Sequence, residues 1–266
     1  MHVVHVISGL GTGGAETFLA TLAPKLRDRG ITQTVVSLTG DGPLASRLED
    51  ERIPVVGLDA RGAIGAVQAA WQLRRVLGEL KPDVVQGWMY HGDLFATLAH
   101  RLARSRRRRL YWNIRCSDMR LADYSYQLRM VVRGCIWASG MPDAVLANSA
   151  AGARVHVEAG YRPRRLLIVP NGIDCSRFAP NAEQRRAVRA ELGLDDKAVL
   201  VLHVARVDPM KDHSGLLAAA ERITGATIAL IGSGTKALAR PPHVVALGQR
   251  ADVARLLAAG DIVVSG

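Results

Sequence analysis

The stretch AVLVLHVARVDPMKDHSGLLAAAE, residues 198–221, decides the fold of this chain. It opens with a mainly apolar run, Ala198–Val204, whose length and composition are typical of a strand buried on both faces of a parallel sheet. A turn containing Pro209 follows, and Asp212 stands where it can cap a helix that begins with His213. A strand, a turn and a helix in this order predict an α/β unit.

Two cations lie in the turn between this strand and this helix. Arg206 comes just after the strand, and Lys211 comes just before the helix cap. Ligands of open α/β sheets bind beyond the carboxyl ends of the strands, and a helix start at that edge favours anions. The two side chains therefore predict an anion clamp. On this stretch alone, a pair of solvated loop charges is an equally good interpretation.

Strand and helix patterns alternate along the whole chain, which indicates an α/β fold with a mainly parallel sheet. The predicted strands are 3–8, 33–38, 55–58, 83–87, 110–114, 144–147, 166–169, 198–204, 227–231, 243–247 and 262–265. The predicted helices are 15–29, 44–52, 63–80, 94–103, 124–139, 149–159, 183–192, 252–259 and one from 213, with 88–93 as a loop. Because Pro170-Asn171-Gly172 is a strong turn signal, we place the boundary between domains 1–172 and 173–266 there.

The composition is that of an ordinary globular protein, with 48% apolar and 22% charged residues. Cys116, Cys135 and Cys175 fit no metal or redox spacing, so we expect no metal site and a reducing, cytoplasmic setting. The sequence shows neither a signal peptide nor a run of about 18 uncharged apolar residues, so we expect no membrane span.

The net charge of +11 is concentrated in the first domain. Residues 1–170 hold 23 Lys and Arg against 14 Asp and Glu, whereas residues 171–266 hold 12 against 10. Arg104 and the run 106–109 contribute to this excess, which favours peripheral contact with an anionic membrane; a merely solvated basic surface is the alternative. Nucleic-acid binding is not expected, because no interleaved aromatic residues accompany the arginines.

Gly9, Gly11 and Gly14 lie between the first strand and the first helix and match the dinucleotide-binding fingerprint. The acid that should follow the second strand is missing, because Leu38-Thr39 occupies its place. An NAD(P)-dependent oxidoreductase is therefore the third and least favoured of the three functional hypotheses that the sequence supports. The glycines can still bring backbone amides close to a phosphate or a sugar.

Two further candidates lie beyond strand ends in the first domain. His91 could serve as an acid, a base or a sugar contact, although a lone histidine is more often structural. Arg115 is the stronger candidate, because a partly buried arginine usually has a partner. The sequence contains no carboxylate pair of glycosidase type and no His/Cys cluster.

Several short motifs follow one another along the chain. They are GTGGAE at 11–16, NS at 148–149, VPNGID at 169–174, VARVDPMKDH at 204–213, IGSG at 231–234, LG at 247–248 and DVARLLAAGDI at 252–262. This set resembles the retaining family 4 glycosyltransferases of GT-B fold, and WMYH at 88–91 and IRCSD at 114–118 are similar to a bacterial branch that builds surface polysaccharides. The resemblance implies two Rossmann-like domains facing each other, the first on the acceptor side and the second binding a nucleotide-sugar.

The resemblance also implies roles for individual residues. It assigns Arg206 and Lys211 to the donor diphosphate, which the amides of Gly13 and Gly14 would reach from the first domain. Many relatives carry a histidine where this chain has Arg115, so either Arg115 or His91 would contact the transferred sugar. The residues expected around the nucleotide-sugar are Asn171, Gly232, Ser233, Gly234, Gly248 and Arg250. No metal or cofactor is expected, because the two cations would neutralise the departing diphosphate.

The resemblance to the family extends to the last residues of the 266-residue sequence. Family members continue past a strand like Asp261–Ser265 into a loop with two donor-binding glutamates, so we expect the second domain to be incomplete in this 266-residue form. The predicted function is transfer of a sugar, with retention, from a nucleotide-sugar to a lipid-linked or polysaccharide acceptor at the cytoplasmic membrane face. The alternative is a catalytically inactive, truncated remnant or a partner-binding paralogue.

Overall fold

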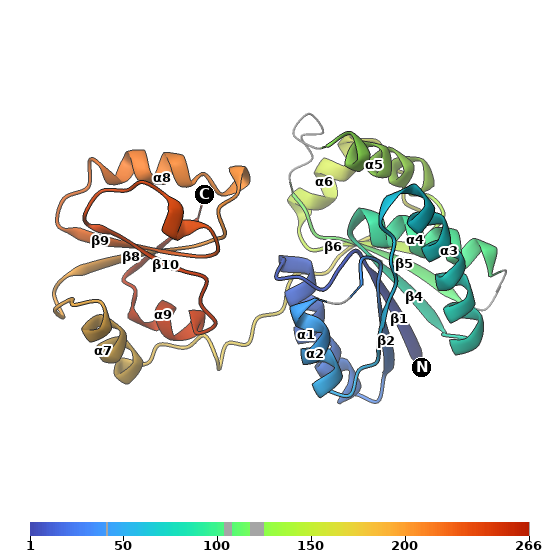
Figure 1. Ribbon diagram of the computed structural model, residues 1–266, viewed down its shortest axis with the longest axis horizontal. Helices are drawn as coiled ribbons and strands as arrows, with labels where there is room; N and C mark the ends of the chain where they lie inside the picture. Colours follow the sequence, from blue (N-terminus) through green and yellow to red (C-terminus); the bar gives the residue numbers. More distant parts are fainter. Residues whose placement is uncertain (41, 104–107, 118–124, 266) are drawn as a thin grey trace. The chain divides into compact units, whose positions relative to one another are not determined.

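The computed structural model describes residues 1–40, 42–103, 108–117 and 125–265. The chain divides into two compact units, Met1–Asn171 and Gly172–Gly266. Each unit has its own parallel sheet with helices on both faces (Figure 1). The predicted α/β class is confirmed.

The first unit contains a sheet of seven strands, all paired in parallel. Their order is β3 (Val55–Gly57), β2 (Thr32–Ser37), β1 (His2–Ile7), β4 (Val84–Trp88), β5 (Arg109–Ile114), β6 (Ala144–Ala147) and β7 (Leu166–Ile168). Because the strands are parallel, the loops that follow them all emerge at the same edge of the sheet. This carboxyl edge holds the glycine-rich loop, Arg115 and the turn that contains Asn171.

Helices cover both faces of this sheet. One face carries α1 (Gly14–Arg27) and α2 (Pro43–Asp50), and the other carries α3 (Gly62–Leu80), α4 (Met89–Leu102), α5 (Tyr126–Ala138) and α6 (Ala150–Glu158). The first layer buries Leu19 and Leu48, and the second buries Leu73 and Val132. Each such side chain contributes roughly 1.5–3 kcal/mol when removed from water, so both layers fix the sheet edge that carries the candidate site.

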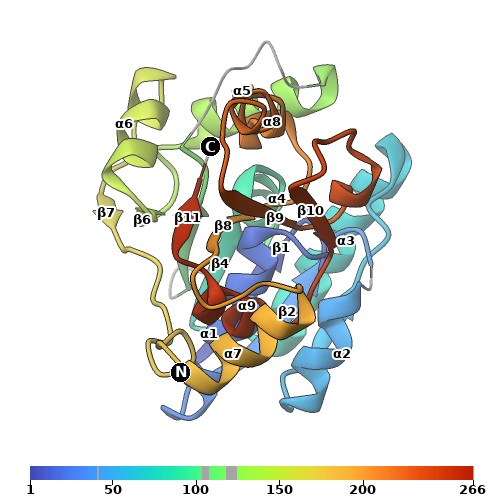
Figure 2. The ribbon, with the colours of Figure 1, turned by 90° about the vertical axis from the view of Figure 1, so that its left-hand side faces the viewer.

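The second unit has four parallel strands, in the order β10 (Val244–Gly248), β9 (Ala226–Ile231), β8 (Val199–Val204) and β11 (Ile262–Val264) (Figure 2). Helices α7 (Ala182–Glu191) and α9 (Val253–Ala259) cover one face, and α8 (His213–Ala220) covers the other (Figure 1). Residues 200–203 of β8 are buried on both faces, as the apolar run predicted.

The start of α4 corrects the sequence prediction. The helix begins at Met89, directly after β4, so residues 88–93 are not a loop and His91 lies in the first helical turn. Two glycines permit this, because a Cβ at Gly92 would collide with the carbonyl oxygen of Val6 and one at Gly87 would lie 2.5 Å from the Cα of Asp93. The helix therefore packs directly onto the strands, and Met89 makes the sharp turn with φ at 59°.

The prediction that Arg104 and the run 106–109 form a basic surface is corrected in part. Residues 104–107 lie outside the described part of the chain, as does Tyr124, where the fifth helix was predicted to start. Arg108 is buried, and its Nη2 donates to the carbonyl oxygen of Leu77 at 2.9 Å. Arg109 donates to Asp143 at 2.8 Å. These two arginines therefore bind other parts of the unit and do not add free charges to a surface patch.

Candidate functional site

The loops after β8, β9 and β10 join at the carboxyl edge of the second sheet. The amide of Val207 donates to the carbonyl oxygen of Ser233 at 2.9 Å, and the amide of Gly232 donates to that of Gly248 at 2.8 Å. These bonds tie three loops into one backbone floor. The predicted site residues that it brings together are Arg206, Gly232, Ser233, Gly234 and Gly248.

Two positions in this floor require glycine. Gly232 has φ at 154°, and a Cβ there would collide with the carbonyl oxygen of Ala205. Gly234 has φ at 84° and lies against Val207, 3.1 Å from where its Cβ would be. Left-handed backbone is strained for residues with a side chain. The glycines therefore let the loops after β8 and β9 approach each other closely.

Arg206 and Lys211 flank Asp208 in the turn after β8. Arg206 is exposed and donates to Oδ2 of Asp208 from Nη2 at 2.8 Å and from Nε at 3.2 Å. Lys211 ends the short helix η2 (Pro209–Lys211), whose first amide is bound by the other oxygen of Asp208. The hydrogen bond from Arg206 lowers the pKa of Asp208 most, and the charge of Lys211 lowers it further. Arg206 thus binds a local carboxylate, and charge-assisted hydrogen bonds of this kind also suit phosphate oxygens.

The start of α8 is anchored beside Lys211. Oδ1 of Asp212 accepts a hydrogen bond from the amide of Gly215 at 3.0 Å, which confirms the predicted cap. The next residue, His213, packs edge-on against His203 of β8, with 4.7 Å between ring centroids. Burial, followed by the charge of His203, lowers the pKa of His213. The helix start therefore rests on a buried, neutral imidazole.

Arg250 is engaged elsewhere in the same unit. Its Nε and Nη2 donate to Asp252 at 2.8 and 2.7 Å, and its Nη1 donates to Glu191 at 3.2 Å. These hydrogen bonds to the carboxylates of Asp252 and Glu191 raise the pKa of Arg250. The guanidinium thus connects α7 to the loop before α9, and its contact with a nucleoside stays a prediction.

The glycine-rich loop of the first unit ends at α1. Gly13 is the cap residue, in extended conformation and without a side-chain cap, and nothing lies within 4 Å of the position where Gly14 would carry a Cβ. The carboxylate of Glu16 lies against Gly13. The start of α1 therefore presents open backbone amides with one carboxylate beside them.

Arg115 follows β5 and is partly buried among aromatic rings and amides. Its Cζ lies 3.7 Å from the ring centroid of Phe18 and 5.4 Å from that of Trp88. Nη1 donates to Oδ1 of Asn113 at 3.3 Å, and Nη2 donates to Oδ1 of Asn171. Burial lowers its pKa to about 10. The structure therefore brings the predicted residues Arg115 and Asn171 into contact.

His91 stands on the first turn of α4 and is partly buried. Burial lowers its pKa, and none of the described residues forms a hydrogen bond with it. Its ring is therefore mostly neutral at pH 7 and able to accept or donate a hydrogen bond. A role in contacting the transferred sugar stays a prediction.

Sequence reasoning missed the residues that surround the two arginines. Asp208 was detectable, because a carboxylate two residues after Arg206 in a tight turn is a natural partner. Phe18, Trp88 and Asn113 were not, because their contact with Arg115 depends on how α1, β4 and β5 are brought together.

Neither a metal-binding cluster nor a membrane-spanning helix is found among the described residues. No three His, Cys, Asp or Glu side chains among them gather closely enough to hold a metal ion. Within the same part of the chain, no helix has both the length and the apolar character needed to cross a bilayer.

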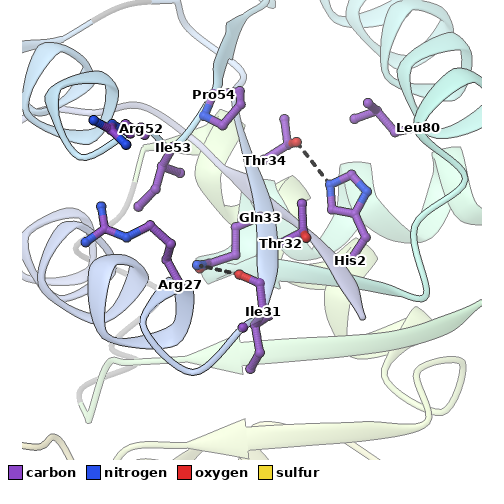
Figure 3. A pocket seen from close by; sticks show the side chains of 11 residues that line it. His2, Arg27, Ile31, Thr32, Gln33, Thr34, Arg52, Ile53, Pro54 and Leu80 are labelled. Atoms are coloured by element: carbon purple, nitrogen blue, oxygen red, sulfur yellow. Dashed lines mark hydrogen bonds between the residues drawn. The ribbon is translucent and has the colours of Figure 1, made fainter.

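A pocket of 510 Å³ lies at the opposite, amino-terminal edge of the first sheet (Figure 3). His2, Thr34 and Arg27 are among its lining residues. Arg27 is already paired with Asp28 and Glu51, at 2.9 and 3.0 Å. Because ligands of parallel α/β sheets bind at the carboxyl edge, this pocket is not the candidate site.

The family model for Glycosyltransferase Family 4 matches residues 12–177, more than half of the chain. The chain therefore belongs to this family. Membership favours neither the oxidoreductase hypothesis nor that of an inactive, partner-binding chain.

Curated relatives agree with this assignment. A D-inositol 3-phosphate glycosyltransferase of Geodermatophilus obscurus is 44% identical over 82 residues, 30% of this chain and 18% of that protein. The lipopolysaccharide core biosynthesis glycosyltransferase LpsD of Rhizobium meliloti is 26% identical over 234 residues, 88% of this chain and 60% of the relative. The chain thus spans less than two thirds of the length of each.

Solved structures establish the fold. Alr3699/HepE of Anabaena, crystallised in complex with UDP, matches with a TM-score of 0.80 at 24% identity, over 99% of this chain and 73% of that one. WaaG, a glycosyltransferase involved in lipopolysaccharide biosynthesis, matches with a TM-score of 0.66 at 15% identity, over 99% and 74% of the two chains. The predicted GT-B class, with a smaller second α/β unit, is confirmed by these likenesses.

Proposed function

We propose that this chain transfers a sugar, with retention, from a nucleotide-sugar donor to a lipid-linked or polysaccharide acceptor. The observation that carries the proposal is the turn after β8 at the carboxyl edge of the second sheet, which holds Arg206, paired with Asp208, and Lys211 at the end of η2. The UDP-glucose complex of the Anabaena protein supports a uridine diphosphate sugar as the donor. The name of the Rhizobium relative supports an acceptor of the lipopolysaccharide class.

The clamp acts on the leaving group. As the bond between the sugar and the diphosphate breaks, negative charge grows on the diphosphate oxygens, and fixed cations stabilise that charge. Removing one such donor commonly costs a few kcal/mol of transition-state stabilisation. We propose that the nucleotide lies beside these cations and that the amides of Gly13 and Gly14 add further donors. No metal or other cofactor is required in this scheme.

Binding of UDP to the full chain tests the clamp. Arg206→Ala should weaken binding about tenfold or more, because a charge-assisted hydrogen bond contributes about 1.5–3 kcal/mol. Arg222→Ala is the matched control, since Arg222 is also exposed but lies beyond the far end of α8. Calorimetric titrations that give the same UDP affinity for wild type and Arg206→Ala would refute the clamp.

We also propose peripheral contact with the inner face of the cell membrane, through an apolar stripe on α3. Ile64, Val67 and Trp71 have exposed fractions of 77%, 60% and 56% and lie three or four residues apart on the helix. Arg74 stacks on Trp71 with Cζ 5.3 Å from the ring centroid, and a surface hollow of 400 Å³ adjoins both. Aromatic and apolar groups beside arginine suit the boundary of an anionic bilayer.

Sedimentation with vesicles tests this surface. Trp71→Ala should reduce binding to anionic vesicles severalfold, and added salt should weaken the binding of wild type. Trp137→Ala is the matched control, because Trp137 is even more exposed, at 79%, but lies on α5. Binding that ignores Trp71, lipid charge and salt would contradict the proposal.

A further inference from the structure

Among the described residues, Arg115 has no carboxylate partner of the kind that three other partly buried arginines have. Arg185, Arg250 and Arg255 pair with Asp261, Asp252 and Glu191 at 2.6, 2.7 and 2.9 Å. Arg115 donates only to amide oxygens, and no carboxylate of the described residues pairs with it. A partly buried charge without a counter-charge is unfavourable, and a bound anion would reduce that cost.

The guanidinium is nevertheless held in one orientation. Phe18 covers it at 3.7 Å, and Trp88 is buried with its Nε1 bonded to Nδ1 of His5 at 3.2 Å. Among the described residues, the amides of Asn113 and Asn171 bind two of its five N–H donors, which leaves three. An oxyanion could therefore bind the remaining donors without rearrangement of the side chain.

We propose that Arg115 is a specificity-determining residue that binds an oxyanion, phosphate or carboxylate, carried by the sugar acceptor. The inference rests on the proposed function, in which Arg206 and Lys211 of the second unit take the donor diphosphate. Arg115, in the first unit, is then assigned to the other substrate. The acceptor class is accordingly a glycan or glycolipid with a sugar phosphate or a uronic acid at its accepting end.

Three small probes test this on the full chain: methyl glucoside, methyl glucuronide and glucose 6-phosphate. At fixed ionic strength, NMR titration should show at least one anionic probe binding tenfold or more tightly than the neutral glucoside. Arg115→Met should remove this preference, and Arg115→Lys should keep part of it, because the charge remains but the planar fork is lost. Arg47→Met, which removes an exposed arginine of α2, should leave it unchanged.

The outcomes separate the claims. Preference for the glucuronide identifies a carboxylate acceptor, and preference for the phosphate identifies a phosphorylated one. The same preference in Arg115→Met, or none in wild type, overturns the proposal. Circular dichroism checks that the variants fold, and Arg115→Lys replaces Arg115→Met if the latter does not. UDP titrated separately tests the donor clamp: if wild type binds no UDP but keeps an Arg115-dependent anion preference, the proposed sugar transfer fails while the anion site stands.

Discussion

The two units hold their candidate anion-binding arginines in opposite ways. Arg206 in the second unit is exposed and already paired with Asp208, two residues away. Arg115 in the first unit is partly buried, stacked on Phe18 and free of any carboxylate partner among the described residues. A paired, exposed cation must exchange one anion for another, whereas a stacked, unpaired one is ready to bind. The contrast suggests different tasks, release of a leaving group by Arg206 and recognition of a substrate by Arg115.

The largest effect on stability is expected from a substitution in the joined loops after β8, β9 and β10, which carry Arg206. Gly232→Ala should lower the free energy of unfolding of the second unit by about 4 kcal/mol, because the new Cβ meets the carbonyl oxygen of Ala205 and the backbone is strained. UDP binding should fall with it. Hydrogen exchange of β8 and β9 measures the loss.

The four tryptophans, at 71, 88, 112 and 137, provide an internal control, because all belong to the first unit. Their fluorescence transition should be unchanged in Gly232→Ala. Unaltered exchange in β8 and β9 would show that the second unit tolerates a side chain at 232.

The free energy of unfolding should fall by roughly 3 kcal/mol when acid protonates His5, which binds Trp88 beside Arg115. Burial lowers the pKa of His5 from 6.5 to about 4. The unfolded chain therefore takes up this proton first, so the stabilising contribution is complete above pH 6.5 and is lost as the pH falls towards 4. Protonation would also end the hydrogen bond that Nδ1 accepts from Trp88.

Denaturant unfolding followed by tryptophan fluorescence at pH 7 and pH 4.5 measures this loss. His5→Gln cannot titrate in this range and should reduce the pH dependence by most of that amount. An equally steep pH dependence in His5→Gln would assign the acid sensitivity to other groups.

The smallest effect should come from making Arg206 resemble Arg115. Asp208→Asn removes the paired charge, while the amide oxygen can still accept the hydrogen bond from Met210. UDP affinity should rise about threefold, the scale of an exposed ion pair. The matched control is Asp195→Asn, which alters an exposed aspartate whose carboxylate forms no ion pair with any described residue. Arg189 binds Asp195 through the backbone carbonyl oxygen, which this substitution keeps. Weaker UDP binding by Asp208→Asn would mean that the carboxylate organises the clamp and does not compete with the ligand.

The elements follow largely from the sequence, and their misplacements have physical causes. The apolar run at 198–204 predicted β8, and the helix cap at Asp212 was found, because both depend on neighbouring residues alone. The start of α4 was predicted five residues too late, since only the packing of Gly87 and Gly92 against neighbouring backbone shows why a helix begins at Met89. Arg108 was taken for a surface charge because its binding to Leu77 crosses 31 residues of sequence.

The sequence by itself determined the fold class, the family and the positions of Arg206 and Lys211 beyond a buried strand, because periodicity and motif spacing are local properties. Only the tertiary structure decided which charged side chains form ion pairs with residues distant in sequence. It brought Glu191 to Arg250 across 59 residues of sequence. It also left Arg115 among aromatic rings and amides, with no counter-charge among the described residues. Whether a charged side chain is paired or available depends on residues that the folded sheet brings to the same edge, and sequence distance carries no record of that.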